Sequence, residues 1–407
     1  MEVWCLVLNE NKACCEESLL DRTAKEAIGA ENFLFLLAFV AFFAFVGTKM
    51  GAVNLINTLM NSAFDLLINT CFYIMAIAVI AGAIGALLSE FGVVALINKM
   101  LSPLMKPVYG LPGAASLGIM TTYLSDNPAI LSLAGDRNYR MFFKKYQLPA
   151  MTNLGTAFGM GAIVTTFVMG IASPDGESFV AAALIGNVGA IIGSIVSTRL
   201  MLRKTVKVYG KSEWCDAGGT AEYTAKDYRE IRPGNVGMRF INALLDGGKT
   251  GVTMGLEIVP GVVIICSLVL ILTNGPSANG MYTGAAYEGV RFLPWLAELA
   301  APVLKAVFGF SSSECIAVPV TALGSAGAAI GLIPQLVESG LATGSDVAVF
   351  TAMCMCWSGY LSTHVAMMDG LKCSQLVGKA IVCHTIGGLF AGFSAHWLYV
   401  LLSTVIG

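Results

Sequence analysis

The chain has 407 residues, of which 56% are hydrophobic and only 12% are charged, whereas about 25% of an average soluble domain is charged. This composition excludes an ordinary soluble enzyme and indicates a polytopic helical membrane protein. The formal net charge of −2 excludes a basic nucleic-acid-binding protein, so no nucleic-acid partner is expected. The 45 glycines agree with a membrane protein, because small residues allow close helix contacts in lipid.

The N-terminal segment does not have the pattern of a secretory leader. It carries the acidic residues Glu16, Glu17, Asp21 and Glu26, and it lacks the succession of a basic region, an apolar region and a small-residue cleavage site that defines a signal peptide. We therefore expect a retained cytosolic or interfacial segment. The 11 cysteines are an odd number and most lie in apolar runs, where a free thiol behaves as a small hydrophobe, so no disulfide framework is expected.

Seven apolar runs are candidates for membrane-crossing helices. A helix needs about 20 residues to cross the ~30 Å hydrocarbon core. The first run is shorter than this and crosses only if residues on either side of it are helical too. The runs are 33–46 and about 64–89, 148–172, 178–201, 250–273, 346–367 and 377–404. We therefore expect an all-α membrane protein with about seven transmembrane helices.

Two further apolar stretches, about 111–134 and 310–333, are interrupted by Gly, Pro, Ser and acidic residues. Each follows a short amphipathic segment, 93–106 or 291–305. Interrupted helices are tolerated in lipid only where protein or a wet cavity satisfies the freed backbone groups. We therefore predict two re-entrant hairpins near a functional site, with a kinked span as the alternative for each.

An internal repeat appears when the chain is compared with itself at an offset of 199 residues. In this register Pro103-Leu-Met-Lys106-Pro-Val-Tyr109-Gly110 matches Pro302-Val-Leu-Lys305-Ala-Val-Phe308-Gly309. The same register aligns two Gly-x-x-x-Gly pairs, a pattern of close helix packing, namely Gly189 and Gly193 with Gly388 and Gly392. No gap is needed, so we predict a duplication.

The duplication divides the chain into four parts. These are an N-terminal segment with the first transmembrane helix (1–61), repeat 1 (62–202), a linker (203–247) and repeat 2 (248–407). Each repeat is expected to contain three crossings and one hairpin. An odd number of crossings turns the second repeat upside down relative to the first.

The basic residues predict the same inversion, because Lys and Arg concentrate in cytoplasmic loops. Loop 136–147 carries four basic residues and its repeat counterpart, 335–346, carries none. The segment 199–249 holds ten of the 24 basic residues, which indicates a cytoplasmic linker. The N-terminus is then cytoplasmic and the C-terminus outside. Inverted repeats with broken helices are the architecture of secondary transporters, whose sites lie at the repeat interface.

The first predicted hairpin contains Asp126, Asn127 and Pro128 between apolar flanks. An ionisable group at membrane depth costs about 2.5–3.5 kcal/mol, so Asp126 is expected to face a cavity, a cation or a partner. Pro128 frees a backbone carbonyl nearby. Asp126 is therefore a candidate for coupling Na⁺ or H⁺, and Asn127 for substrate contact. The same three residues are also typical of a helix start with no binding role.

The second predicted hairpin contains Ser312, Ser313 and Glu314. Hydroxyl and carboxylate groups suit a polar solute, because ribose-like hydroxyls donate hydrogen bonds to a carboxylate. These three residues are therefore candidate substrate contacts. A run of hydroxyls and a carboxylate is also typical of a helix cap.

The adjoining spans add further polar candidates. The candidate substrate contacts among them are Asn153, Ser358 and Thr363. His364 titrates near neutral pH and is a candidate for proton coupling, although a lone His in a helix bundle is more often a packing residue. Glu257 is a further candidate for ion coupling, although Lys249 lies only about two turns away and a surface position is the alternative.

Other chemistries find little support in the sequence. Cys354 and Cys356 lie on an apolar helix without the spacing and His partners of a zinc site. No Walker A loop is present, so ATP is not expected to drive the process. We see no nucleophile and base that the sequence places together, and therefore expect neither an enzyme, nor a metal site, nor a cofactor other than a coupling ion.

The two copies of an amphipathic lead-in, a Pro-x-x-Lys-x-x-aromatic-Gly corner, a polar hairpin and a following span resemble the Gate, or nucleoside-recognition, domain family. This family is found in spore maturation proteins A and B, in concentrative nucleoside transporters and in the membrane region of ferrous iron transporter B. Residues 62–202 look like a spore maturation protein A-type half and 245–405 like a B-type half, as in a fusion. The resemblance implies membrane transport or a maturation role.

In concentrative nucleoside transporters, a hairpin carries Gly-Gln-Thr-Glu-Ala-Pro, whose polar side chains meet the nucleoside. Ser313 and Glu314 resemble the Thr-Glu pair of that hairpin. The Gln position is Ser312, and Pro319 follows Glu314 by five residues instead of two. The resemblance implies that Glu314 is a hydroxyl-binding carboxylate.

We therefore predict an inner-membrane secondary transporter, a Na⁺ or H⁺ symporter that binds a nucleoside or another small polar solute between two hairpins. Its expected partners are the lipid bilayer and the solute, and its oligomeric state, a homo-oligomer included, stays open. The alternative is a membrane scaffold or maturation factor without transport, whose linker recruits partners. Trp214, Tyr223 and Tyr228 could form its docking patch, although a solvated linker is the more common case for such a segment.

Overall fold

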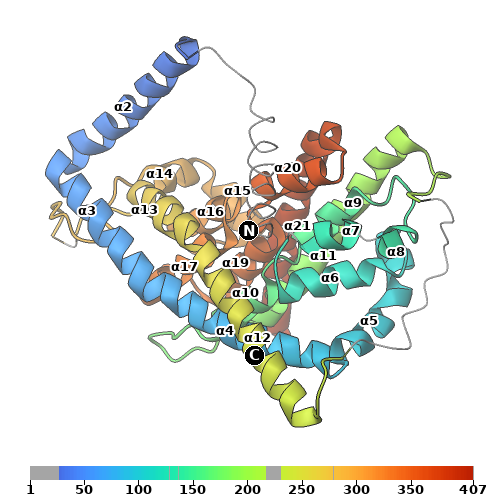
Figure 1. The fold of residues 1–407 in the computed structure, drawn as a ribbon. Coiled ribbons are helices and arrows are strands. Elements are labelled where there is room, and N and C mark those ends of the chain that lie inside the picture. The colour runs from blue at the N-terminus through green and yellow to red at the C-terminus, as the bar shows by residue number, and fades with distance from the viewer. Residues whose placement is uncertain (1–26, 128, 136, 217–230, 278, 407) are drawn as a thin grey trace, which may run out of the picture. The chain divides into compact units, whose positions relative to one another are not determined.

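The computed structural model describes residues 27–127, 129–135, 137–216, 231–277 and 279–406. Within these ranges the chain consists of helices and their connections (Figure 1), with a single isolated antiparallel bridge between Lys144 and Trp214 and no longer strand. Tyr223 and Tyr228, proposed above for partner docking, and Pro128 of the first hairpin lie outside the described residues. The all-α fold class predicted from composition is confirmed.

The chain forms two compact units, Met1–Ala52 and Val53–Gly407. The described part of the first unit contains helix α2 (Ala30–Met50), whose 21 residues are long and apolar enough to cross a membrane. This helix contains the predicted first crossing, 33–46, and extends it by one turn at either end.

The other helices that the structure describes belong to the second unit. Its first half comprises α3 (Ala52–Asp65), π-helical turn η1 (Leu66–Cys71), α4 (Phe72–Glu90), α5 (Val93–Leu104), η2 (Met105–Tyr109), α6 (Ala115–Leu124), α7 (Ala129–Gly135), α8 (Arg137–Arg140), α9 (Ala150–Thr156), α10 (Gly161–Met169) and α11 (Val180–Tyr209). Helices α6 and α7 form the first predicted hairpin, and α5 with η2 forms its amphipathic lead-in.

The second half follows the same order of elements. It comprises α12 (Val236–Glu257), η3 (Gly261–Cys266), α13 (Ser267–Thr273), α14 (Phe292–Leu299), α15 (Ala301–Phe308), η4 (Ser313–Ile316), α16 (Ala317–Ala322), α17 (Ala326–Gly331), α18 (Ile333–Glu338), α19 (Gly344–Trp357), α20 (Tyr360–Gly370), η5 (Ser374–Leu376) and α21 (Val377–Ile406). Helices α16 and α17 form the second predicted hairpin, and α14 and α15 form its lead-in.

Six helical segments in the described ranges are long and apolar enough to cross a membrane. They are Ala30–Met50, Ala52–Glu90, Ala150–Met169, Val180–Tyr209, Val236–Thr273 and Ser374–Val405. A seventh results if α15 and the segment Ser313–Ala322, which meet at 74°, are taken as one bent span. The predicted crossing at 346–367 is instead divided between α19 and α20, each too short to cross alone. The count of about seven therefore holds, and the protein is a multi-pass membrane protein.

Close packing of the long helices follows from their small residues. A Cβ on Gly189 would lie 2.7 Å from Ala391 O, and a Cβ on Gly193 would lie 2.7 Å from Ala391 Cβ, so α11 and α21 touch almost backbone to backbone. Helices α4 and α12 pack in the same way, because a Cβ on Gly247 would overlap Gly82 O. The first Gly-x-x-x-Gly pair, which the sequence predicted as a packing motif, thus packs against a helix from the other half of the chain.

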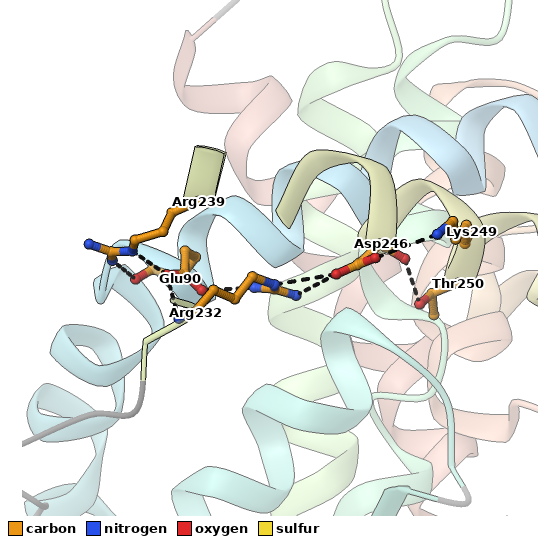
Figure 2. A network of polar contacts seen from close by, with 6 residues as sticks. All are labelled: Glu90, Arg232, Arg239, Asp246, Lys249 and Thr250. Atoms are coloured by element: carbon orange, nitrogen blue, oxygen red, sulfur yellow. Dashed lines mark hydrogen bonds and ion pairs between the residues drawn. The ribbon is translucent and has the colours of Figure 1, made fainter. Parts of the chain in front are cut away.

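An ion-pair network ties the end of α4 to the segment that leads into α12 (Figure 2). The side chain of Glu90 is only 4% exposed and accepts hydrogen bonds from Arg239 Nε at 2.7 Å and Arg232 Nη1 at 2.8 Å. Arg232 also pairs with Asp246 on α12 at 3.3 Å. The predicted linker 203–247 is therefore fixed at its C-terminal end, and its ends are helical, since α11 continues to Tyr209 and α12 begins at Val236.

Several backbone features recur at the offset of 199 residues. The repeated corner ends in Gly110 and Gly309, which have φ values of 78° and 67° and terminate η2 and α15 in the left-handed conformation. Only glycine adopts this conformation without a steric cost. These pairs support the proposed duplication, whose boundaries at 62–202 and 248–407 stay predictions.

Candidate functional site

Two helical segments break at matched positions. Helices α9 and α10 are separated by residues 157–160, and the break ends at Met160, with φ 55°. Helices α19 and α20 are separated by Ser358 and Gly359, and the break ends at Gly359, with φ 60°. Met160 and Gly359 are 199 residues apart, so each half carries one discontinuous helix with the same left-handed turn. Breaks of this kind in lipid require a protein or water environment for the freed backbone groups.

The tips of both hairpins contact the second of these breaks. Asn127 Nδ2, at the tip between α6 and α7, donates a hydrogen bond to Ser358 O at 2.7 Å. The backbone N–H of Gly359 donates to Ala322 O, at the end of α16, at 3.0 Å. The first break has close contact with the first tip as well, because a Cβ on Gly159 would overlap Asn127 Oδ1. The two hairpins and the two helix breaks therefore converge.

A cavity of about 160 Å³ lies where these elements meet. Its walls come from the first hairpin tip, Met160, the C-terminal end of α12, the second hairpin tip and the start of α20. The polar side chains among its lining residues are Asp126, Asn127, Glu257, Ser325, Ser358, Ser362 and Thr363. We call it the central cavity.

The hydrogen bonds in the central cavity leave mostly acceptors free. Ser362 Oγ and Thr363 Oγ1 both donate to Gly359 O, at 3.3 and 2.9 Å. Asn127 is 2% exposed, and no hydrogen-bond partner for its Oδ1 exists among the described residues. Asp126 accepts a hydrogen bond from the backbone N–H of Asn127 at 2.7 Å. The cavity is thus lined by two carboxylates and by the hydroxyls of Ser325, Ser358, Ser362 and Thr363.

Half of the candidate substrate-binding and ion-coupling residues named from the sequence line this cavity. They are Asp126, Asn127, Glu257, Ser358 and Thr363. They come from both halves of the chain and from four different elements. Sequence patterns alone did not indicate that Glu257 lies beside the first hairpin.

The serines and glutamate of the second hairpin lie elsewhere. Ser312, Ser313 and Glu314 form the start of the hairpin, around η4, and are not among the residues that line the central cavity. Glu314 is 8% exposed and forms an ion pair with Arg291 Nη2 at 2.8 Å, while Ser313 Oγ donates to Glu314 Oε2 at 3.1 Å. A solute that used Glu314 would therefore have to compete with Arg291.

Asn153 belongs to a buried polar network between α9, α11 and α21. Its Nδ2 donates to Ser197 Oγ at 2.9 Å and to Ala380 O at 3.0 Å. Ser197 Oγ also lies 2.9 Å from Nδ1 of His384. Asn153 is completely buried and joins the two halves of the chain through these contacts.

His364 is fully buried beside a second histidine. Its ring centroid lies 4.7 Å from that of His384, and its Nδ1 lies 3.1 Å from Tyr360 O. His364 Nε2 has no hydrogen-bond partner among the described residues. The adjacent residue in the sequence, Thr363, lines the central cavity, whereas His364 packs against Tyr360 and His384.

A second, larger cavity of about 880 Å³ lies around η1, the C-terminal end of α10 and the segment from α17 to α18. Its polar lining includes Asp65, Asn69, Tyr287, Gln335 and Glu338. Asp65 accepts hydrogen bonds from Asn69 Nδ2 at 2.7 Å and from the Tyr287 hydroxyl. We call it the vestibule.

The sequence argument missed Met160, Ser325 and Ser362, which also line the central cavity. Ser325 could have been found, because it matches Asp126 in the 199-residue register and caps α17 by accepting a hydrogen bond from Ala328 N at 3.2 Å. Met160 matches Gly359 in the same register. Among the described residues, no group of three or more His, Cys, Asp and Glu side chains could hold a metal ion.

Comparison with known proteins identifies the fold. No family model matches the chain, and no curated protein matches it. A doubly substituted variant of CNTnw, a concentrative nucleoside transporter, in an outward-facing state has a TM-score of 0.51 and 14% identity, with 92% of this chain and 85% of that chain covered. The structure of CNTnw in an inward-facing substrate-bound state also has a TM-score of 0.51 and 14% identity, and the match covers 91% of this chain and 85% of that chain. Both are transporters rather than enzymes, and this chain therefore has a transporter fold like that of the concentrative nucleoside transporters.

Proposed function

We propose that the protein is a secondary transporter that moves a small polar solute by alternating access to the central cavity. One observation carries this proposal: the tips of both hairpins and the breaks of both discontinuous helices meet at a polar cavity within a membrane protein. Broken helices around a site between structural repeats are the arrangement that alternating access requires. The fold similarity to CNTnw supports the same function.

The substrate contacts in this proposal are Asn127, Ser358 and Thr363. Asp126 and Glu257 are the candidates for coupling Na⁺ or H⁺ in symport, and His364 is a further candidate. Nucleosides are the first neutral solutes to test, because CNTnw is a nucleoside transporter. Ser312, Ser313, Glu314 and Asn153 then act indirectly, by holding the hairpin and the helices that form the cavity.

The charge distribution supports an orientation in the cytoplasmic (inner) membrane. With Lys- and Arg-rich loops on the cytoplasmic side, the N-terminus is cytoplasmic and the C-terminus outside. The kinship with Gate-domain proteins and with a fused spore maturation A/B pair belongs to the same proposal, and so does assembly as a homo-oligomer.

Transport is tested with the full-length protein in liposomes. Uptake of a labelled nucleoside mixture and of small polar solutes is measured under an imposed Na⁺ or H⁺ gradient. Thr363→Val removes a hydroxyl from the cavity wall, and we expect uptake to fall about three- to tenfold, as for the loss of one hydrogen bond.

Thr166→Val is the matched control. Thr166 is an exposed residue of α10 whose hydroxyl donates to Ala162 O at 2.7 Å, the same bond to the residue four positions earlier that Thr363 makes. Uptake in Thr166→Val should equal that of the unmodified protein. Absence of gradient-driven uptake for every solute would favour the scaffold role, whereas equal uptake in both variants would remove Thr363 from the site.

A further inference from the structure

We propose that the transported solute carries a positive charge, as a small organic cation of the ammonium or guanidinium class. This inference rests on the proposed function and adds the substrate class to it. It comes from the ionisable groups of the central cavity and of the vestibule, which are all acidic apart from tyrosine.

The central cavity has two carboxylates and no basic side chain. Asp126 and Glu257 are its only charged residues, and the lining contains no Lys, Arg or His. The N-termini of α10, α17 and α20 also lie at the cavity and add partial positive charge there. The charged side chains that line the cavity are thus all acidic, and a cation is the ligand that can pair with them.

The vestibule has the same sign of charge. Its charged residues are Asp65 and Glu338, again without Lys, Arg or His. Helix α17 lies between the two cavities, because Ala326 and Gly327 line the central cavity and Gly331 lines the vestibule. Clefts lined by a single sign of charge concentrate counter-ions and raise their association rates. A cation that enters the vestibule therefore meets a second acidic cavity behind one short helix.

Of these four carboxylates, Asp65 and Asp126 are half-buried and Glu257 and Glu338 are exposed, whereas the buried carboxylate of Asp346 is held by Ser311 and Thr343. Glu90, Asp216 and Glu314 each pair with an arginine, and Glu288 is held by Ser277, Thr283 and the backbone N–H of Gly284. By contrast, no ion pair forms at Asp65, Asp126, Glu257 or Glu338 within the described ranges. Ionisable groups at membrane depth mark substrate or ion pathways, and Asp126 and Glu257 have no basic side chain to neutralise them.

The hydrogen-bonding groups of the central cavity also suit a donor-only ligand. The hydroxyl hydrogens of Ser362 and Thr363 are both used on Gly359 O, so toward a ligand these groups can only accept. Asn127 Nδ2 donates one of its two hydrogens to Ser358 O, and Asn127 Oδ1 is buried against Gly159. Ammonium and guanidinium groups have donors and no acceptors, which matches this set.

The size of the cavity limits the solute. A volume of about 160 Å³ holds roughly five water molecules at about 30 Å³ each. Typical pockets for drug-sized ligands have about 300–1,000 Å³. The cavity in this conformation therefore fits a compact cation better than a nucleoside.

The test uses the full-length protein and two pairs of compounds that differ in charge and hardly in shape. Choline is compared with its uncharged carbon analogue dimethylbutanol, and guanidinium with urea. Binding is measured by thermal shift in detergent, and uptake of labelled choline and guanidinium is measured in proteoliposomes. We expect the cations to stabilise the protein and enter the liposomes saturably, whereas the neutral partners neither stabilise it nor compete.

Charge-removing variants locate the effect. Asp126→Asn or Glu257→Gln should lower the affinity for the cation by about tenfold or more. Glu298→Gln, an exposed residue of α14 outside both cavities, should leave it unchanged. If the cavity variants fail to fold, Glu338→Gln in the vestibule should slow cation uptake at low ionic strength, and added salt should remove the difference from the unmodified protein.

Three results would overturn the inference. Gradient-driven uptake of uridine that neither cation inhibits would leave the transporter intact and exclude a cationic substrate. Stabilisation by Na⁺ alone would assign the carboxylates to the coupling ion and not to the solute. Absence of binding and uptake for both cations would exclude the cationic substrate, and the transport function would then be decided by uptake of the nucleosides and small polar solutes named above.

Discussion

The two helix breaks at the central cavity share a backbone geometry but differ in their residues. The first has Gly159 before Met160, and the second has Ser358 before Gly359, with φ values of 55° and 60° at the second position of each. Glycine adopts this conformation freely, whereas a methionine pays a steric cost of about 1–2 kcal/mol. The two breaks thus have the same turn, but the glycine is the first residue of the pair in the first break and the second residue in the second break.

The exchange of glycine positions has a chemical result. At the first break, Gly159 leaves room for the amide of Asn127, and at the second break, Ser358 supplies the carbonyl that this amide binds. The first hairpin tip carries Asp126, whereas the matched position of the second tip is Ser325. The comparison teaches that the halves share a backbone and divide the side-chain functions between them.

Filling the space at the first break should have the largest effect. A Cβ in Gly159→Ala would overlap Asn127 Oδ1 and lie 2.8 Å from Ser358 Oγ, so the amide must leave its place. We expect a loss of about 3 kcal/mol in stability, from overpacking and from the broken hydrogen bond, together with loss of uptake. Thermal unfolding in detergent and liposome uptake measure the two effects.

Gly378→Ala in α21 provides the control for that substitution, because no atom lies within 4 Å of the added Cβ. Its unfolding temperature should stay the same or rise. A Gly159→Ala protein as stable as Gly378→Ala would show that the first break has more space than the structure indicates, and the contrast between the two breaks would vanish.

Changing the glycine of the second break should have an intermediate effect. Gly359→Ala places a Cβ at φ 60° and 3.0 Å from Gly324 O, so we expect a loss of about 1–2 kcal/mol. Gly324→Ala, whose Cβ would make only ordinary contacts at 3.4 Å and beyond, should cost less. Equal unfolding temperatures for the two variants would mean that the second break does not need its glycine.

The loops that follow the two hairpins differ as well, and the expected effect there is the smallest. Arg140, in the loop of the first half, forms a bidentate pair with Asp216 at 2.8 and 2.9 Å. The matched loop of the second half has no arginine; its Asp346 instead accepts hydrogen bonds from Ser311 and Thr343. We expect Arg140→Gln to cost at most about 1 kcal/mol, because the pair is partly exposed.

The pH dependence of this pair has a defined sign. The Arg140 guanidinium holds the pKa of the Asp216 carboxyl below its usual value. The stabilisation is therefore complete above about pH 4, the unfolded-state pKa, and is lost as the pH falls through the lower folded-state pKa. Unfolding temperatures measured from neutral to acidic pH should converge for Arg140→Gln and the unmodified protein at the acidic end, and Lys211→Gln should follow the unmodified protein throughout.

Much of the fold could be predicted from the sequence, because hydrophobic length and small-residue spacing are local signals. The lead-in helices, the interrupted hairpins and the Pro-x-x-Lys-x-x-aromatic-Gly corners lie where the pattern placed them. The split of the predicted crossing 346–367 into α19 and α20 was not foreseen, since Ser358 and Gly359 look ordinary in a glycine-rich apolar run.

The candidate site was predictable only in part, because convergence of distant residues is a tertiary property. Asp126 stood out as an ionisable group in an apolar stretch, but its position in the same cavity as Glu257 depends on the packing of α12. The ion pair between Glu314 and Arg291 joins residues 23 positions apart across a helix start, which no periodicity indicates. The contact of His364 with His384 likewise arises from the packing of α20 on α21.

The glycine contacts between α4 and α12 have a mechanical consequence. Where backbones touch, as Gly247 does Gly82, no side chain can rearrange to let the helices slide, and Glu90 with its two arginines holds their common end. The hairpin arms α6, α7, α16 and α17 are only 6–10 residues long and lack such clamps. The pairing of α4 with α12 is therefore rigid, and in the proposed transport cycle the short hairpin arms are the elements that we expect to move.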